Sequence, residues 1–280
     1  MALPSPQEKS EIYLILSISG VGLAILGLYA FLSFSNYQSI VDQELESHAA
    51  TLERASVELE NFIDTRFILL GELAGSVEAD FLNTVAREEK TALFLHRYPE
   101  FQKIRITNFA GEDLTLKSRL RTLGSTDLER AAGKAAFEEA RAGRHYIGQA
   151  GVSFGSIPST ELSIPITNEK AEVRGVIIAD LDLRKIWDTV SQIQVGAKGA
   201  VYVVDGEGNL AAHPDRQFAL TVANLKDRGI INEILKNKSE NKYGIFSGEY
   251  KNQLAETVFS VARALPFGWG VIVEEPKNDF

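Results

Sequence analysis

Five polar residues in the middle of the chain could bind a small charged molecule. They are three arginines, a tyrosine and an aspartate: Arg119, Arg121, Arg144, Tyr146 and Asp180. Arginine forms paired hydrogen bonds with a carboxylate, an aspartate accepts those of an ammonium group, and tyrosine supplies an aromatic wall. The set predicts a pocket for a small anionic or zwitterionic molecule. In the alternative interpretation the arginines form a solvated rim, and Asp180 caps the helix that follows it.

The four histidines do not indicate catalysis or a metal site. His48, His96, His145 and His213 fall on separate expected elements, and their spacing matches no metal-ligand motif. There are no cysteines, which excludes thiolate ligands and a cysteine nucleophile. We therefore expect no enzymatic activity and no cofactor. We expect His213 to close a hairpin through a hydrogen bond to the backbone, with Pro214 ending the strand.

Composition is that of an ordinary globular protein. The 280 residues are 45% hydrophobic and 24% charged, and the formal net charge is −9. Wholesale disorder is therefore excluded. The acidic balance argues against a chain that mainly binds nucleic acid.

One stretch near the N-terminus differs sharply from the rest. Residues 12–34 carry no charged side chain. As a helix they would be about 34 Å long, enough to cross a hydrocarbon core of about 30 Å. This predicts a transmembrane helix after a short cytoplasmic segment, residues 1–11; a cleaved signal peptide is the alternative. Lys9 precedes the stretch, and the first basic residue after it is Arg54, which slightly favours a cytoplasmic N-terminus.

A long stalk helix is expected over residues 35–98. There is no proline from Asn36 to Tyr98, and apolar residues recur at helical spacing. Two rows of residues seven apart form a coiled-coil type of seam: Leu45, Leu52 and Leu59, then Ala49, Ser56, Ile63, Leu70 and Val77. The seam could pack on its own domain or form a dimer interface, and both could hold along different stretches.

Residues 99–193 and 194–276 are expected to form two modules of the same kind. Each runs through strand, turn, strand, helix and further strands, and the first includes a helix over 127–142. The predicted fold class is α+β, with helices laid on antiparallel sheets. Trp187, Tyr202 and Trp269 lie on strongly apolar elements, so core packing is expected.

Several stretches resemble the double Cache sensor domains of bacterial transmembrane receptors. They are 95–112, 175–183, 199–205 with 208–215, and 268–276. The resemblance implies two PAS-like modules behind one long membrane-proximal helix. It also implies a place in the bacterial inner membrane with the sensor in the periplasm, and a homodimer through the stalk. Residues 277–280 would then lead toward a second transmembrane helix. An output domain, such as a histidine kinase, a diguanylate cyclase or a chemotaxis module, is not in this chain.

The resemblance also bears on the ligand. In amino-acid-binding members, an Arg-x-Trp-Tyr motif and a later aspartate form the pocket. Asp180 matches that aspartate by its place after Gly175-Val176, but Arg144-His145-Tyr146 lacks the Trp-Tyr pair. An organic acid is therefore as plausible as an amino acid. The expected function is extracytoplasmic sensing of such a molecule in the distal module and signalling through the stalk. The alternative is a membrane-anchored interaction or dimerisation module without a small ligand.

Overall fold

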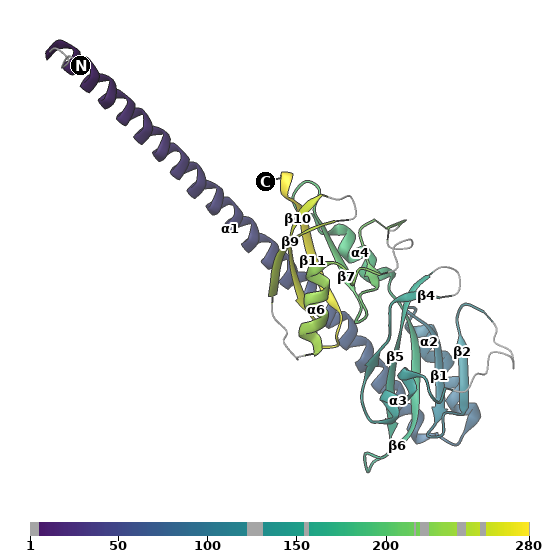
Figure 1. Ribbon diagram of the computed structural model, residues 1–280. Coiled ribbons are helices and arrows are strands. Elements are labelled where there is room, and N and C mark those ends of the chain that lie inside the picture. Colours follow the sequence, from purple (N-terminus) through teal and green to yellow (C-terminus); the bar gives the residue numbers. More distant parts are fainter. Residues whose placement is uncertain are drawn as a thin grey trace. The chain divides into compact units, whose positions relative to one another are not determined.

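The computed structural model describes residues 6–121, 131–153, 157–215, 217–218, 224–239, 245–252 and 256–279 (Figure 1). The chain divides into two compact units, one reaching to Ser47 and one formed by His48–Asp279. Helix α1 (Pro6–Ala79) contributes to both units. All the strands belong to the second unit.

The first unit is the N-terminal part of α1. Its described apolar side chains between Leu23 and Phe34 are more than half exposed. Among the described residues, no helix combines the length and the hydropathy that a membrane span requires. The span expected at 12–34 lies partly outside this description, because the side chains of residues 12–21 are not described. It stays a prediction.

The expected stalk helix over 35–98 is two helices. Helix α1 ends at Ala79, and α2 (Thr84–Arg97) begins after Asn83, whose side chain accepts the backbone N–H of Ala86 at 3.1 Å. Buried Arg87 holds the intervening turn, because its guanidinium donates to the carbonyl of Phe81 at 2.5 Å and to the hydroxyl of Thr115 at 2.9 Å. An asparagine cap and one buried arginine thus bend the chain where the apolar pattern predicts a continuous helix.

The seven-residue seam packs on the sheets of its own unit. Its members from Leu52 onward are buried within the single chain: Leu52, Ser56, Leu59, Ile63, Leu70 and Val77. From Leu52 to Val77 the seam therefore packs within its own chain, which is one of the two roles expected for it; the other was a dimer interface.

The first sheet follows α2 and is antiparallel throughout. Its strands are β1 (Phe101–Asn108), β2 (Asp113–Ser118), β3 (Tyr146–Ile147), β4 (Gly151–Ser153), β5 (Ile157–Thr167) and β6 (Val173–Asp182). The order is β2-β1-β6-β5-β3, with β4 also paired to β5. Helix α3 (Ala135–Arg141) is shorter than the helix expected over 127–142. The start expected for this helix, at residue 127, lies outside the described residues.

The two faces of this sheet have different partners. Cross-strand neighbours Thr115, Ile106, Ile177 and Ile164 form one buried row. Thr115 bonds to Arg87 of α2, so this row faces the stalk side. On the opposite face, the hydroxyl of Ser163 donates to the carbonyl of Ala136 in α3 at 2.6 Å. Figure 1 shows α2 and α3 on opposite sides of the sheet.

The second sheet repeats this plan. Helix α4 (Arg184–Gln192) leads into β7 (Ala200–Val204), β8 (Leu210–Ala212), α6 (Gly229–Ser239), β9 (Ile245–Lys251), β10 (Thr257–Ala264) and β11 (Gly270–Pro276), followed by a 3-10 turn (Lys277–Asp279). The antiparallel order is β8-β7-β11-β10-β9. Helix α6 packs Ile230, Ile231 and Ile234 into a buried cluster with the sheet. As expected, Trp187, Tyr202 and Trp269 are buried.

Candidate functional site

A polar cavity of about 380 Å³ opens beside strands β3, β4, β5 and β6 of the first sheet. It is lined by Tyr146, Gly148, Gln149, Gly151, Val152, Ser153, Ser159, Thr160, Glu161 and Asp180. This volume suits a small organic molecule, since ligand cavities typically measure about 300 to 1,000 Å³. The cavity is the candidate ligand site.

Asp180 lines the cavity, and only one of its two carboxylate oxygens has a partner among the described residues. One carboxylate oxygen, Oδ2, lies 2.8 Å from the ammonium of Lys103. The other, Oδ1, is fully buried and has no hydrogen-bond partner among the described residues. A buried acceptor without a partner is costly, so a rearrangement that brings a donor to this oxygen would gain free energy.

Helix capping does not explain Asp180. Asp182, two residues later, accepts the backbone N–H of Arg184 at the start of α4 at 2.8 Å, and its carboxylate also binds the Arg184 guanidinium. The interpretation of Asp180 as a cap is therefore wrong. Asp182, two residues further along β6, makes the hydrogen bond at the start of α4. Asp180 has no such bond and lines the cavity.

Tyr146 lies on β3 at the far wall of the cavity. Burial raises the pKa of its phenol, and the nearby carboxylates Glu161, Glu139, Glu207 and Asp205 raise it further. The hydroxyl therefore stays protonated and can donate to a ligand. The electrostatic potential around it is negative, because carboxylates dominate its surroundings.

The arginines expected in the pocket lie elsewhere. Exposed Arg144 pairs with Glu139 at 2.7 Å, and this contact raises the Arg144 pKa. Arg119 follows β2 and donates to the carbonyl of Leu95. Exposed Arg121 lies next to residues outside the description and is not in the cavity wall. The structure thus brings Tyr146 and Asp180 together in one cavity. Arg119, Arg121 and Arg144 are not in its lining: Arg119 and Arg144 bind other acceptors, and Arg121 is exposed.

Glu161 and Ser153 belong to the cavity and were not predicted from the sequence. Ser153 lies in a G-x-S-x-G sequence, a pattern that serine hydrolases place on a sharp turn between a strand and a helix. Here Ser153 ends β4, and its hydroxyl donates to Gln102 at 2.7 Å; among the described residues it has no hydrogen bond to a histidine. The sequence pattern of β5 could have identified Glu161, because side chains alternate between the two faces of a strand and Glu161 falls on the face that Asp180 shares.

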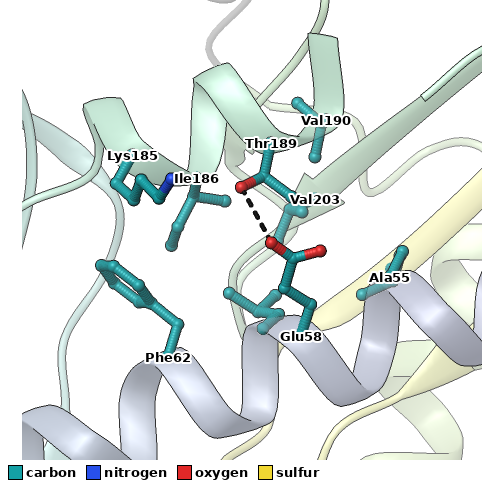
Figure 2. A pocket seen from close by; sticks show the side chains of 10 residues that line it. Ala55, Glu58, Phe62, Lys185, Ile186, Thr189, Val190 and Val203 are labelled. Atoms are coloured by element: carbon teal, nitrogen blue, oxygen red, sulfur yellow. Dashed lines mark hydrogen bonds between the residues drawn. The ribbon is translucent and has the colours of Figure 1, made fainter. Parts of the chain in front are cut away.

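A second cavity, of about 40 Å³, lies where α4 meets the stalk helix (Figure 2). Phe62, Ile186, Val190 and Val203 give it largely apolar walls, and the Thr189 hydroxyl donates to Glu58 across it at 3.3 Å. It has room for little more than a water molecule. We interpret it as a packing gap between two helices.

The comparisons with known proteins give the family. The model of the Cache domain family matches residues 36–280. This chain belongs to the Cache domain family. None of the curated proteins compared with it matches. Three similar solved structures are the periplasmic sensory domain of the Campylobacter jejuni chemoreceptor Tlp1, the ligand-binding domain of the Pseudomonas aeruginosa amino acid chemoreceptor PctC with GABA, and that of Campylobacter jejuni Tlp3 with L-norvaline.

These structures share the Cache fold at low sequence identity. Identities are 16%, 15% and 13%, with TM-scores of 0.62, 0.60 and 0.61. The matches cover 84%, 81% and 85% of this chain and 95%, 96% and 92% of the respective neighbours. The recognition of two PAS-like modules in tandem is thus confirmed at the level of the fold.

In this Cache domain a single carboxylate links the cavity wall to the second sheet. Asp205, at the end of β7, is fully buried and accepts the backbone N–H groups of Glu207 and Asn209 in its own hairpin. Its Oδ2 also accepts the N–H of Ala150 at 2.8 Å, from the loop between β3 and β4. A displacement of that loop would therefore act on the β7–β8 hairpin through this hydrogen bond.

The corresponding face of the second sheet holds a polar cluster. Glu274 on β11 accepts hydrogen bonds from the hydroxyls of Tyr202 and Tyr250 and lies 3.8 Å from Arg228. Burial, followed by the Glu274 charge, raises the pKa of both tyrosines. Next to it, Nδ1 of His213 accepts the backbone N–H of Asp215 at 3.0 Å, as expected, and burial lowers the His213 pKa.

Proposed function

We propose that this chain is the sensory part of a membrane receptor and that the cavity of the first sheet binds a small polar molecule. The single observation that carries the proposal is a polar cavity of ligand size whose lining includes Tyr146, Glu161 and Asp180. A closed, apolar cavity would have favoured the alternative of an interaction module without a ligand.

The structural neighbours support sensing as the role. Their names describe sensory and ligand-binding domains of chemoreceptors, two of them in complex with GABA or L-norvaline. Anionic or zwitterionic ligands were expected here because of the arginines. Since those arginines are not in the cavity wall, that reason no longer holds, and the ligand class depends on the cavity itself.

A membrane anchor is part of the proposal. The described apolar side chains from Leu23 to Phe34 are exposed around the whole helix, among them Ile25, Tyr29 and Phe31. Such a surface is unfavourable in water and favourable in lipid. We propose that residues 12–34 anchor the chain in the inner membrane and that the sheets lie in the periplasm.

The route of the signal would run from β6 into α4 and the stalk. Asp180 and the cap Asp182 are two residues apart on β6, and α4 starts immediately afterwards. Buried Ile186 and Val190 of α4 line the gap shown in Figure 2 with Phe62 of the stalk. A ligand would shift this contact only by as much as its affinity differs between two arrangements of α4.

We also propose that the chain forms a homodimer through its stalk. The contact would use the face of α1 opposite the seam, because the seam is buried within the chain. The side of α1 that faces away from the sheets exposes Val57, Ile68, Gly71 and Gly75. Small and apolar residues on one helix face allow close helix contact. In light scattering, Ile68→Glu would shift a dimer toward monomer; an unchanged mass would exclude this face.

The central experiment is a thermal-shift screen of the purified full-length chain against polar metabolites, with Asp180→Asn as the matched variant. A ligand of this cavity raises the melting temperature of the parent chain, and Asp180→Asn reduces that rise. If no compound shifts the midpoint, or if Asp180→Asn responds like the parent, sensing by this cavity is wrong.

A further inference from the structure

An arginine lies within the polar cluster of the second sheet, although its backbone belongs to a helix. Arg228 directly precedes α6, and its carbonyl accepts the N–H of Asn232 at 2.9 Å in the first turn of that helix. Its side chain is largely buried, with 13% of its surface exposed. Its Nη1 lies 3.8 Å from Oε2 of Glu274, and its Cζ lies 5.8 Å from the centre of the Tyr250 ring. The charged end of the side chain thus lies against a carboxylate and an aromatic ring.

The groups around this guanidinium have the properties of a cation-binding site. Three strands of one sheet supply them, Tyr202 from β7, Tyr250 from β9 and Glu274 from β11. Glu274 is only 5% exposed. The Tyr202 hydroxyl donates to its Oε2 at 3.1 Å and lies 2.7 Å from the Tyr250 hydroxyl. A buried carboxylate that is held by hydroxyls and bordered by an aromatic ring attracts a positive charge.

Arg228 does not have the best geometry that this site could give a cation. The 3.8 Å between its Nη1 and Oε2 of Glu274 exceeds the roughly 2.9 Å of a charge-assisted hydrogen bond. The backbone of Arg228 is fixed at the start of α6, whereas a free guanidinium could approach the carboxylate more closely. Burial lowers the pKa of Arg228, but Tyr202, Tyr250 and Glu274 together raise it by more. The site therefore favours a cation.

We propose that the polar cluster is a binding site for a guanidinium group and that the chain fills this site with its own Arg228. The second module then holds an internal ligand, which joins the start of α6 to β11. The inference also gives the class of external ligand. Once the side chain of Arg228 is removed, the site binds a small alkylguanidinium from solution. The inference does not depend on ligand binding by the cavity of the first sheet.

An ordinary ion pair would behave differently from such a site. The attraction in an ion pair depends on charge and distance, so any small cation could replace the arginine. A site that fits a guanidinium distinguishes this planar, forked cation from a compact ammonium of the same charge. It also distinguishes it from a neutral molecule of similar shape. Methylguanidinium, methylammonium and N-methylurea represent these three cases.

The experiment is thermal unfolding of the full-length chain and of Arg228→Ala with each compound at millimolar concentration. We expect Arg228→Ala to melt below the parent chain, because Glu274 loses its cation. Methylguanidinium should recover at least about half of that loss, because it binds only the folded state. The other two compounds should recover none of it. The parent chain should respond to none of the three, since Arg228 occupies the site.

Two further variants show whether the recovery comes from this site. Arg263→Ala is the matched control, because Arg263 of β10 pairs with Glu53 in an exposed position and lies 3.7 Å from Glu60. Its melting temperature should not respond to methylguanidinium. When Arg228→Ala is combined with Glu274→Gln, the carboxylate charge is absent and the recovery should disappear.

Several results would overturn the inference. They are an unchanged melting temperature in Arg228→Ala, no recovery by methylguanidinium, an equal recovery by methylammonium, and a response of either further variant like that of Arg228→Ala. If Arg228→Ala does not fold by itself, its circular dichroism is compared with and without methylguanidinium, and failure to restore the helical signal also overturns the inference. None of these results concerns the cavity of the first sheet, which the metabolite screen tests separately.

Discussion

The central strands of the two sheets carry a carboxylate at comparable places, and the two carboxylates have opposite surroundings. Asp180 lies near the end of β6, and Glu274 lies near the end of β11. Asp180 lines a cavity and has one oxygen without a partner among the described residues, whereas Glu274 is surrounded by two tyrosines and an arginine of its own module. The same fold thus has a cavity beside one carboxylate, the open site, and packs side chains around the other, the filled site. The residues on the neighbouring strands and on α6 decide which of the two results.

The largest effect is expected from removing the filled site's carboxylate. Glu274→Ala removes the acceptor that the Tyr202 and Tyr250 hydroxyls share and the carboxylate 3.8 Å from half-buried Arg228, although the two hydroxyls still bond to each other at 2.7 Å. The loss should cost about 3 kcal/mol of unfolding free energy. Asp180→Ala releases Lys103, whose side chain is about one-third exposed and can be solvated, and should cost less than about 1 kcal/mol. Urea denaturation of both variants measures the difference; equal losses would mean that the two carboxylates are not as different as their contacts indicate.

A smaller effect is expected where the two modules meet. Asp205→Ala deprives the N–H groups of Ala150, Glu207 and Asn209 of their acceptor. The three hydrogen bonds are only partly buried, so water can solvate the freed donors, and the total loss should be about 1 to 3 kcal/mol. Besides a lower midpoint in urea, we expect faster hydrogen exchange at Ala150, which lies between the lining residues Gln149 and Gly151 of the cavity. Unchanged exchange there would show that Asp205 stabilises only its own hairpin.

A still smaller effect separates the tyrosines of the two sites. Tyr202→Phe removes a buried hydroxyl that donates to Glu274 and should cost about 1 kcal/mol. The Tyr146 hydroxyl makes no hydrogen bond within the described part of the protein, so Tyr146→Phe should leave stability nearly unchanged and affect ligand binding instead. Thermal unfolding with and without a bound probe distinguishes the two, and a stability loss in Tyr146→Phe would contradict the contrast.

The smallest effect is a pH dependence confined to the filled module. Because burial lowers the pKa of His213, the unfolded chain takes up a proton near pH 6.5 that the folded chain still excludes. Stability contributed by neutral His213 is therefore fully present above about pH 6.5 and is lost as the pH falls toward the folded pKa. His213→Gln should flatten the melting temperature between pH 7 and pH 5 relative to the parent chain. A profile with the same slope in both proteins would assign the dependence to other groups.

Much of the fold was predictable because it depends on local pattern. Strands β1 (Phe101–Asn108) and β7 (Ala200–Val204) lie within the stretches 95–112 and 199–205 on which the family resemblance depends. The break after Ala79 was missed, since a single asparagine cap and a distant bond from Arg87 to Thr115 outweigh a continuous apolar pattern. At the site, Asp180 and Tyr146 line one cavity. Arg144, which was expected beside them, forms an ion pair with Glu139, five residues before it.

By itself, the sequence determined the α+β class, the two-module order and the family, because alternation, helical spacing and turn residues act over short distances. Only the tertiary structure decided how the charges pair. Strand register sets Glu161, Asp180 and Lys103 in one row, and a shift of one residue would turn each of them to the other face. Register across β5, β6 and β1 depends on the packing of α3 on one face and the stalk on the other. The charge of the cavity, and with it the expected ligand, follows from that packing.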